Sequence, residues 1–138
     1  MLNDNTPAAQ SHRALKFSFL RGSYAISRFA AETPLPSWLP SAGFVSTTRT
    51  SEELSIVCSE SDIPVDVKAD REWTCLKLEG PFPFSLTGIL SSFIAPLSAN
   101  AIPIFAISTY DTDYVLIKQP FAGTALDVLS KAGHTLME

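Results

Sequence analysis

The chain has 138 residues, of which 46% are hydrophobic and 17% charged, and its formal net charge at pH 7 is −4. That length can bury the core of one ordinary domain or of two small ones. The acidic balance and the scattered basic residues argue against a nucleic-acid partner, because binding phosphate needs clustered lysine and arginine.

Neither a membrane span nor a secretion signal is expected from the sequence. The longest apolar region, 86–107, is interrupted by polar residues and two prolines, whereas a span needs about 18 or more consecutive apolar residues. Residues 1–12 are polar and predict a disordered segment without the apolar centre of a signal peptide. Cys58 and Cys75 give neither a disulfide framework nor a metal-ligand spacing. We therefore expect a reduced, cytoplasmic protein without metal or cofactor.

The amino-terminal half is dominated by predicted strands. Four segments alternate between apolar and polar residues, which predicts strands at 15–19, 24–29, 44–49 and 54–59. Three prolines between residues 34 and 40 exclude a long helix there. A polar stretch then breaks the strand pattern, so we place a domain boundary near Ser61, which gives an amino-terminal module at 1–61 and a carboxy-terminal module at 62–138.

The carboxy-terminal half predicts both strands and helices. The predicted strands are 73–79, 103–109, 114–118 and 135–137. Apolar residues recur at spacings of three and four from Leu86 to Leu97, which predicts a helix with Ser85 as its N-cap. A second helix is expected to open at Pro120 and to end at Gly133. This order is β-α-β-β-α-β, the ferredoxin-like split unit.

The first half repeats part of this pattern. The turn from Thr50 to Glu53 lies between two predicted strands and resembles the hydroxyl-rich, acidic turn from Thr109 to Asp113. The predicted fold class is therefore α+β, with two tandem ferredoxin-like modules. Each module is expected to have an antiparallel sheet with helices on one face, and the first is expected to be degenerate.

One polar cluster is predicted in the second module. Segment 80–85 leads into a helix whose first N–H groups lack intrahelical partners and suit an anion. The strand that follows carries Thr109, and the turn after it carries Asp113, whose carboxylate can hold a cation. An anion site beside a cation site favours a zwitterion, such as a free amino acid.

Three segments of the sequence, 53–60, 78–81 and 107–116, carry a family resemblance. They resemble the tandem ACT-domain family, whose small regulatory modules bind amino acids. The run 108–113 is also similar to the ACT modules of the cytosolic arginine sensors. The resemblance covers most of the chain, and it implies a regulatory protein rather than an enzyme.

The resemblance also implies a ligand site between two ACT modules. The loop before the helix would donate N–H groups to the ligand carboxylate, Ile104 would make main-chain contacts, and Asp113 would hold an ammonium group or a basic side chain. The glycine-rich loop of the sensors is replaced here by Pro81 to Phe84, a stiffer and more apolar lid. The implied ligand-binding residues are Gly80, Phe82, Phe84, Ser85, Ile104, Thr109, Tyr110 and Asp113.

Structural explanations exist for several of these residues. Asp111 and Asp113 can cap a β-turn, and Phe82 and Phe84 can be core aromatics. The Ser85 hydroxyl can be only a helix cap.

Three functions therefore stay open. The first is an amino acid-binding regulatory module that forms homodimers and acts on a protein partner. The second is an assembly module without a small ligand. The third is a small-molecule enzyme on a ferredoxin-like scaffold, a fold that hosts many functions. Neither histidine belongs to a recognisable nucleophile motif, so we expect no enzyme.

Overall fold

The computed structural model describes residues 13–137, and the chain divides by its internal contacts into two compact units. The amino-terminal unit is formed by residues 21–74. The carboxy-terminal unit combines the chain up to Leu20 with everything from Cys75 onward. The disorder expected for residues 1–12 lies outside the described residues.

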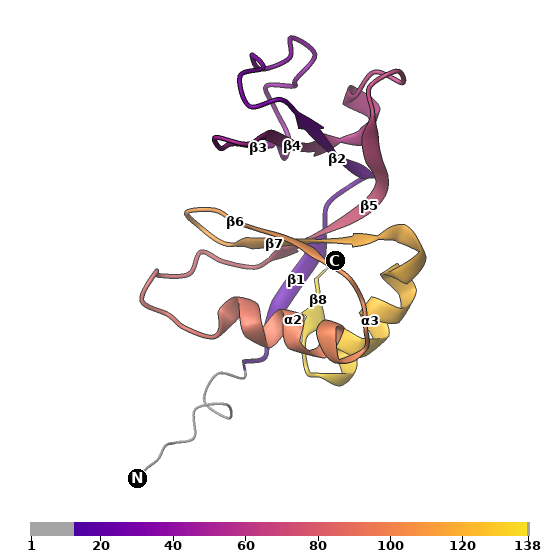
Figure 1. The fold of residues 1–138 in the computed structure, drawn as a ribbon. Helices are drawn as coiled ribbons and strands as arrows, with labels where there is room; N and C mark the ends of the chain where they lie inside the picture. The colour runs from indigo at the N-terminus through magenta and orange to yellow at the C-terminus, as the bar shows by residue number, and fades with distance from the viewer. Residues whose placement is uncertain (1–12, 138) are drawn as a thin grey trace. The chain divides into compact units, whose positions relative to one another are not determined.

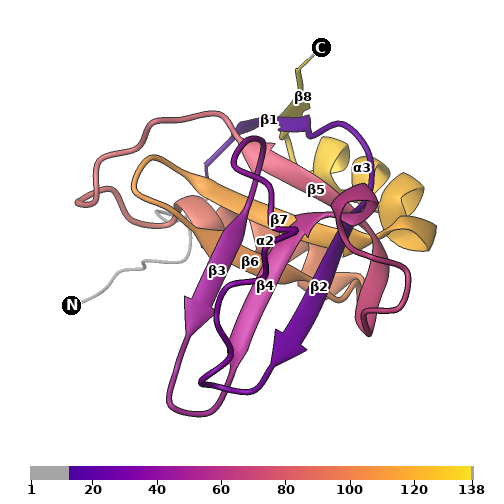
Figure 2. The same cartoon turned by 90° about the horizontal axis from the view of Figure 1, so that it is seen from above.

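The amino-terminal unit is built from strands. Its strands are β2 (Tyr24–Phe29), β3 (Ser46–Arg49), β4 (Leu54–Ser59) and the first part of β5 (Ala69–Leu78). They lie in the order β3-β4-β2-β5, every pair antiparallel, and Figure 2 shows β3, β4 and β2 side by side. A short 3-10 helix, η1 (Glu60–Asp62), follows β4. No α-helix forms between residues 21 and 74, all of which are described, in keeping with a degenerate first module.

The amino-terminal unit has its own apolar core. On β2 and β4, Ala25 pairs with Cys58 and Phe29 pairs with Leu54 in register. Alternate residues of a strand point to one face of the sheet, and these side chains meet Ile63 from the segment after η1. Proline-rich loop residues, Trp38 and Leu39 among them, pack against this core.

Strand β5 contributes to both units. Its first part pairs with β2, and its last part pairs with β1 (Lys16–Phe19) and β7 (Asp113–Lys118). Glu72, at φ 67, lies where the pairing with β2 shifts register. The internal contacts thus divide the chain inside β5. The division into two repeated modules, 1–61 and 62–138, stays a prediction.

The sheet of the carboxy-terminal unit is mixed. Its strands, in spatial order, are β6 (Phe105–Ser108), β7, β5, β1 and β8 (Thr135–Leu136). Antiparallel pairing holds between β6 and β7 and between β1 and β5, but β1 and β8 are parallel, with Lys16 opposite Thr135. The expectation of a purely antiparallel sheet is wrong here. β1 lies between β5 and β8 in the sheet. Both β1 and β8 run opposite to β5, so they are parallel to each other.

Two helices cover one face of this sheet, as Figure 1 shows. They are α2 (Ile89–Ala99) and α3 (Ala122–Lys131), and a 3-10 turn, η2 (Gln119–Phe121), leads into α3. Their buried residues Phe93, Leu97 and Leu129 join Phe17 and Val115 of the strands in one core. Among the described residues, no helix combines the length and apolar character that a membrane crossing requires.

Helix α2 begins later than its apolar stripe suggests. Gly88, at φ 81 and ψ 2, precedes Ile89 as the N-cap and makes no side-chain cap. The prediction that Ser85 caps the helix is wrong. The chain before the helix closes a separate turn, in which the Leu86 N–H donates to the Pro83 carbonyl at 3.0 Å.

Both helices end in a Schellman pattern, in which the residue after the C-cap is left-handed. That residue is Ala101, at φ 57, for α2 and Gly133, at φ 98, for α3. In α2 the Ala101 N–H donates to the Ser98 carbonyl, and the Ile102 N–H donates to the Leu97 carbonyl, both at 3.0 Å. The end of α3 has the two equivalent bonds. These bonds satisfy carbonyls that a helix end otherwise leaves without partners.

Candidate functional site

A hollow of about 220 Å³ lies in the carboxy-terminal unit, between the loop after β5 and the turn that joins β6 to β7. We call it the turn pocket. Its lining residues are Phe82, Pro83, Phe84, Leu86, Ile89, Ser108, Thr109, Tyr110, Asp111, Thr112 and Asp113. The pocket therefore belongs to one unit, and two short chain segments supply nearly all of its wall.

The turn is held by two threonines. The Thr109 N–H donates to the Thr112 carbonyl at 2.8 Å, and the Thr112 N–H donates back to the Thr109 hydroxyl oxygen at 3.3 Å. The Thr112 hydroxyl in turn donates to the carbonyl of Leu78, the last residue of β5, at 2.8 Å. Because Thr112 is only 5% exposed, this bond is shielded from water. This hydrogen bond thus holds the turn against the end of β5.

The loop is held against the same turn. The Phe82 N–H donates to the Asp111 carbonyl at 2.9 Å. Gly80 lets the loop approach so closely, because a Cβ placed on it would lie 2.9 Å from the Asp111 carbonyl oxygen and 3.1 Å from the Thr112 Cβ. Real Cβ atoms do not come that near to a main-chain oxygen, so only glycine fits without movement of the loop or the turn.

Two aromatic rings stand at the rim of the pocket. Phe84 from the loop and Tyr110 from the turn meet edge to face, with their centroids 4.9 Å apart. They are 75% and 79% exposed, respectively, so the pair is a surface feature and not part of the core. The deeper wall is apolar and includes Ile89, the first residue of α2, which is 6% exposed.

The charge of the lining is acidic. Asp111 and Asp113 are the only residues of the lining set that carry a formal charge at pH 7. The Ser108 hydroxyl donates to one carboxylate oxygen of Asp113, which fixes that side chain and leaves its second oxygen for another partner. Two carboxylates without a basic neighbour in the lining favour a cationic group. At the same wall, the N–H of Ile89 precedes the hydrogen-bond ladder of α2, whose first bond runs from Ser92 to Gly88.

Five of the eight predicted ligand-binding residues line the turn pocket, and three do not. Five of them, Phe82, Phe84, Thr109, Tyr110 and Asp113, line the turn pocket together. Gly80 packs closely against Asp111 and Thr112 of the turn but is outside the lining. Ser85 is exposed and also outside the lining. Ile104 lines a separate apolar hollow of about 430 Å³ beside the end of α2. The role of each residue in binding a ligand stays a prediction.

Sequence reasoning missed part of the lining. Ser108 and Thr112 flank residues that were singled out, and their spacing in the strand–turn–strand segment could have signalled them. Ile89 was missed because the helix was expected to start earlier, which would turn this residue toward the core alone. Asp111 was assigned only to turn capping, and it lines the pocket as well.

The two thiols of the chain are buried and stay protonated at neutral pH. Burial raises the pKa of the Cys75 thiol to about 12. Burial, together with the charge of Asp62, raises the pKa of Cys58 to about 11, and neither thiol is a ready nucleophile at neutral pH. Within residues 13–137, no three histidine, cysteine or acidic side chains are grouped to hold a metal ion.

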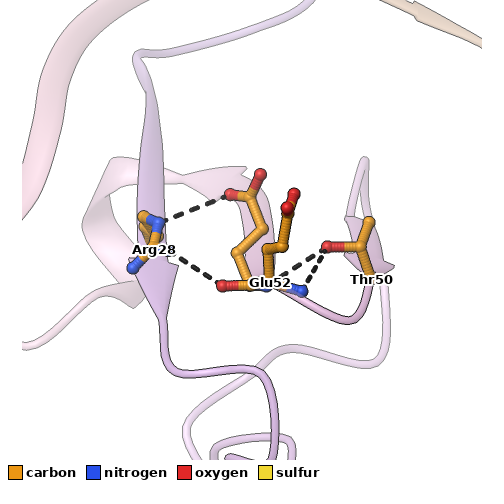
Figure 3. A network of polar contacts seen from close by, with 4 residues as sticks. Arg28, Thr50 and Glu52 are labelled. Carbon is orange, nitrogen blue, oxygen red and sulfur yellow. Dashed lines mark hydrogen bonds and ion pairs between the residues drawn. The ribbon is translucent and has the colours of Figure 1, made fainter.

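The hairpin turn of the amino-terminal unit has the same design. The Thr50 N–H donates to the Glu53 carbonyl at 2.9 Å, and the Glu53 N–H donates to the Thr50 hydroxyl oxygen at 3.2 Å. The guanidinium of Arg28 donates to the Glu52 carbonyl at 2.9 Å and lies 3.8 Å from the Glu53 carboxylate (Figure 3). The Glu52 carbonyl occupies the same position in its turn as the Asp111 carbonyl in the turn pocket. The first accepts from an arginine side chain, and the second accepts from the Phe82 N–H.

Comparisons with known proteins agree with this architecture. A family model described as an ACT domain matches residues 68–131, and a second model, described as an N-terminal domain, matches residues 22–66. The crystal structure of protein Atu0741 from Agobacterium tumefaciens is 46% identical in sequence, with a TM-score of 0.85. The match covers 91% of this chain and 93% of that one.

Two further matches are more distant. The human protein described as putative protein CASTOR3P is 34% identical over 87 residues, which cover 54% of this chain. They cover 53% of that protein, so the chain spans about half the length of this curated relative. Aspartate kinase from Clostridium acetobutylicum, described as an allosteric enzyme, is 10% identical with a TM-score of 0.62, covering 88% of this chain and 35% of that one. At that identity the likeness shows the fold alone, an ACT-like α+β fold.

Proposed function

Because the chain belongs to the ACT-domain proteins, we propose that its carboxy-terminal unit binds a free amino acid in the turn pocket as a regulatory signal. ACT domains are regulatory modules that bind small molecules rather than catalytic domains. The observation that carries the choice of ligand is the meeting of two carboxylates and the start of α2 around one hollow.

The lining offers a partner for each part of a zwitterion. The ammonium group would bind the oxygen of Asp113 that Ser108 does not occupy. The carboxylate would lie at the positive end of α2, where the N–H of Ile89 begins the helix. The side chain would extend along the paired rings of Phe84 and Tyr110, which offer apolar edges and faces.

The regulatory output follows from differential binding. A ligand shifts an equilibrium only toward the state that binds it more tightly. We propose that a second ACT module closes over the turn pocket in the bound state, and that the closed state is the one recognised by a regulated protein partner. Homodimer formation is part of the same proposal, because pairing of two chains supplies further modules.

The test is a thermal unfolding screen of the protein with each of the twenty amino acids. A ligand at about a hundred times its Kd adds about 2.7 kcal/mol to the free energy of unfolding. That gain raises the Tm by several degrees at this chain length. A rise with one amino acid or one chemical class of amino acids supports the proposal and names the ligand.

Two variants assign the response to the pocket. Asp113→Asn removes the charge proposed to hold the ammonium group, and it should abolish the Tm rise. Asp127→Asn removes the same charge from an exposed position on α3 of the same unit, and it should leave the rise intact. An unchanged response of Asp113→Asn would place the ligand elsewhere.

A pure assembly module is the second candidate. It is favoured by the exposure of Phe84 and Tyr110, since aromatic rings are enriched at protein interfaces. In that case the screen is flat, and sedimentation shows dimers whose dissociation increases when both rings are replaced by alanine.

A further inference from the structure

His134 is the one histidine within the described residues, and its ring is buried in the carboxy-terminal unit at 4% exposure. Its Nδ1 accepts a hydrogen bond from the Leu15 N–H at 3.1 Å. Its Nε2 lies 2.9 Å from the Ser92 carbonyl oxygen. Because a carbonyl can only accept, Nε2 carries the proton and Nδ1 carries none. The bond from Leu15 therefore requires the neutral ring, whereas Nε2 can donate to the Ser92 carbonyl in either charge state.

The ring joins three elements at one point. Leu15 leads into β1, Ser92 belongs to the first turn of α2, and His134 connects α3 to β8. The Leu15 carbonyl also accepts from the Thr135 N–H at 2.8 Å. The imidazole therefore completes a pair of bonds at the point where β1 and β8 begin to run side by side. The Ser92 hydroxyl oxygen accepts from the Arg13 N–H at 2.9 Å.

We propose that His134 is a pH-sensitive latch that holds β8 and the start of β1 onto the carboxy-terminal unit. A proton added to Nδ1 would turn this atom into a donor that faces the Leu15 N–H. Two donors then meet at the position of one hydrogen bond, and the Leu15 N–H loses its acceptor. A buried donor without an acceptor destabilises the folded state, so acid should release the strand pair.

Few charged residues occur on the segments that meet at the ring. Helix α2 carries no charged residue. On the β1 side, the nearest charged residues along the chain are Arg13 and Lys16, and the Arg13 guanidinium donates to the Thr87 carbonyl at 2.9 Å. Helix α3 contributes Asp127 and Lys131, both exposed, and β8 contributes none.

The direction of the pH dependence follows from proton uptake. The folded unit disfavours the charged ring, whereas a histidine in the unfolded chain takes up a proton near pH 6.5. Unfolding below that pH therefore consumes a proton. The stabilisation by His134 is present above about pH 6.5 and is lost as the pH falls, with an unfolding constant that rises up to about tenfold per pH unit.

The experiment compares denaturant unfolding of three proteins between about pH 7.5 and about pH 5. In His134→Asn, the side-chain oxygen can accept from the Leu15 N–H as Nδ1 does, but it does not titrate. His12→Asn replaces the other histidine of the chain as the matched control. The unfolding constant should rise steeply toward acid in the wild type and in His12→Asn, and much less in His134→Asn. Equal slopes in all three proteins overturn the proposal.

Amide hydrogen exchange of the wild-type protein gives a second measurement that does not depend on a variant folding. The N–H groups of Leu15, Thr135 and Met137 are bonded at the latch or along the β1–β8 pair. Their protection, corrected for intrinsic exchange, should fall below about pH 6.5. The amides of Val115 and Leu116 in β7 serve as the reference within the same unit. Protection that falls equally at both places contradicts a local latch.

Discussion

The Thr112 hydroxyl donates its hydrogen bond to the Leu78 carbonyl over 2.8 Å, and both residues are buried. This contact joins the turn of the β6–β7 hairpin to the end of β5. Asp111 and Asp113 flank Thr112 in the chain, so the same bond positions both carboxylates of the turn pocket. Stability and binding should therefore respond together when it is removed.

Thr112→Val keeps the shape of the side chain and removes the donor. The Leu78 carbonyl then lacks its partner away from water, which should lower the free energy of unfolding by about 1–3 kcal/mol. Thr112→Ser retains a hydroxyl and should cost less. Denaturant unfolding measures the difference, and a Val variant as stable as the Ser variant would show that the bond contributes little.

Gly80→Ala should push the loop away from the turn. The added Cβ would lie 2.9 Å from the Asp111 carbonyl oxygen, and an overpacked contact of this kind costs about 1–3 kcal/mol. Gly123→Ala is the control, because no atom lies within 4 Å of its Cβ position and the residue is inside α3. That control should not lose stability, because alanine is the better helix former. A Gly80→Ala variant with wild-type Tm and wild-type ligand response would contradict the close packing.

The two helix ends predict opposite effects of opposite substitutions. Ala101 adopts a left-handed conformation that costs a non-glycine residue about 1–2 kcal/mol. Ala101→Gly should therefore stabilise the protein, by less than this amount because glycine also loosens the unfolded chain. Gly133→Ala, at φ 98, should destabilise it by about 1–2 kcal/mol. Thermal unfolding shows whether the Tm of each variant rises or falls. A shift of both variants in one direction would refute the left-handed backbone as the cause of both effects.

The two thiols should be almost inert in the folded protein. Burial raises the pKa of Cys75 to about 12 and, with the Asp62 charge, that of Cys58 to about 11, from 9.0. At a given pH near neutral, the thiolate fraction falls about a thousandfold and about a hundredfold, respectively. Alkylation should be slow in buffer and fast in denaturant, and Cys58→Ala assigns the remaining signal to Cys75. Fast alkylation of the native protein would contradict the burial.

The same raised pKa values give the pH dependence of stability a definite sign. A thiol that stays protonated in the folded state but ionises in the unfolded chain contributes stability below about pH 9, its ordinary value. That contribution is lost as the pH rises toward 11 and 12. Denaturant unfolding at alkaline pH should therefore show a loss that the double variant Cys58→Ala, Cys75→Ala lacks.

Local patterns in the sequence were sufficient to predict most elements of the fold. The apolar spacing of α2, Pro120 before α3 and Gly133 after it all act within a few residues, so the chain itself carries the signal. The start of α2 was missed because the stripe extends backward through Leu86, while the left-handed Gly88 interrupts the helix. The parallel pairing of β1 with β8 was missed because alternating apolar and polar residues predict a strand but not the strand that it pairs with.

The candidate site shows the same limit. Thr109, Tyr110 and Asp113 lie in one short turn, so their meeting in one pocket follows from local geometry. Ile104 could not be placed this way, because the chain leaves α2 at its far end and Ile104 lines another hollow there. Distances between elements depend on packing of the core, which residue spacing does not describe.

The pairing of β1 with β5 also makes the amino-terminal unit an insertion. Phe19 lies opposite Leu76, and the Leu20 N–H donates to the Cys75 carbonyl at 2.9 Å, where the inserted segment begins and ends. Two antiparallel strands in this register can be joined by a two-residue Asn-Gly turn. Replacing residues 21–74 by such a turn would convert the carboxy-terminal unit into one uninterrupted small domain, with the turn pocket and both helices intact.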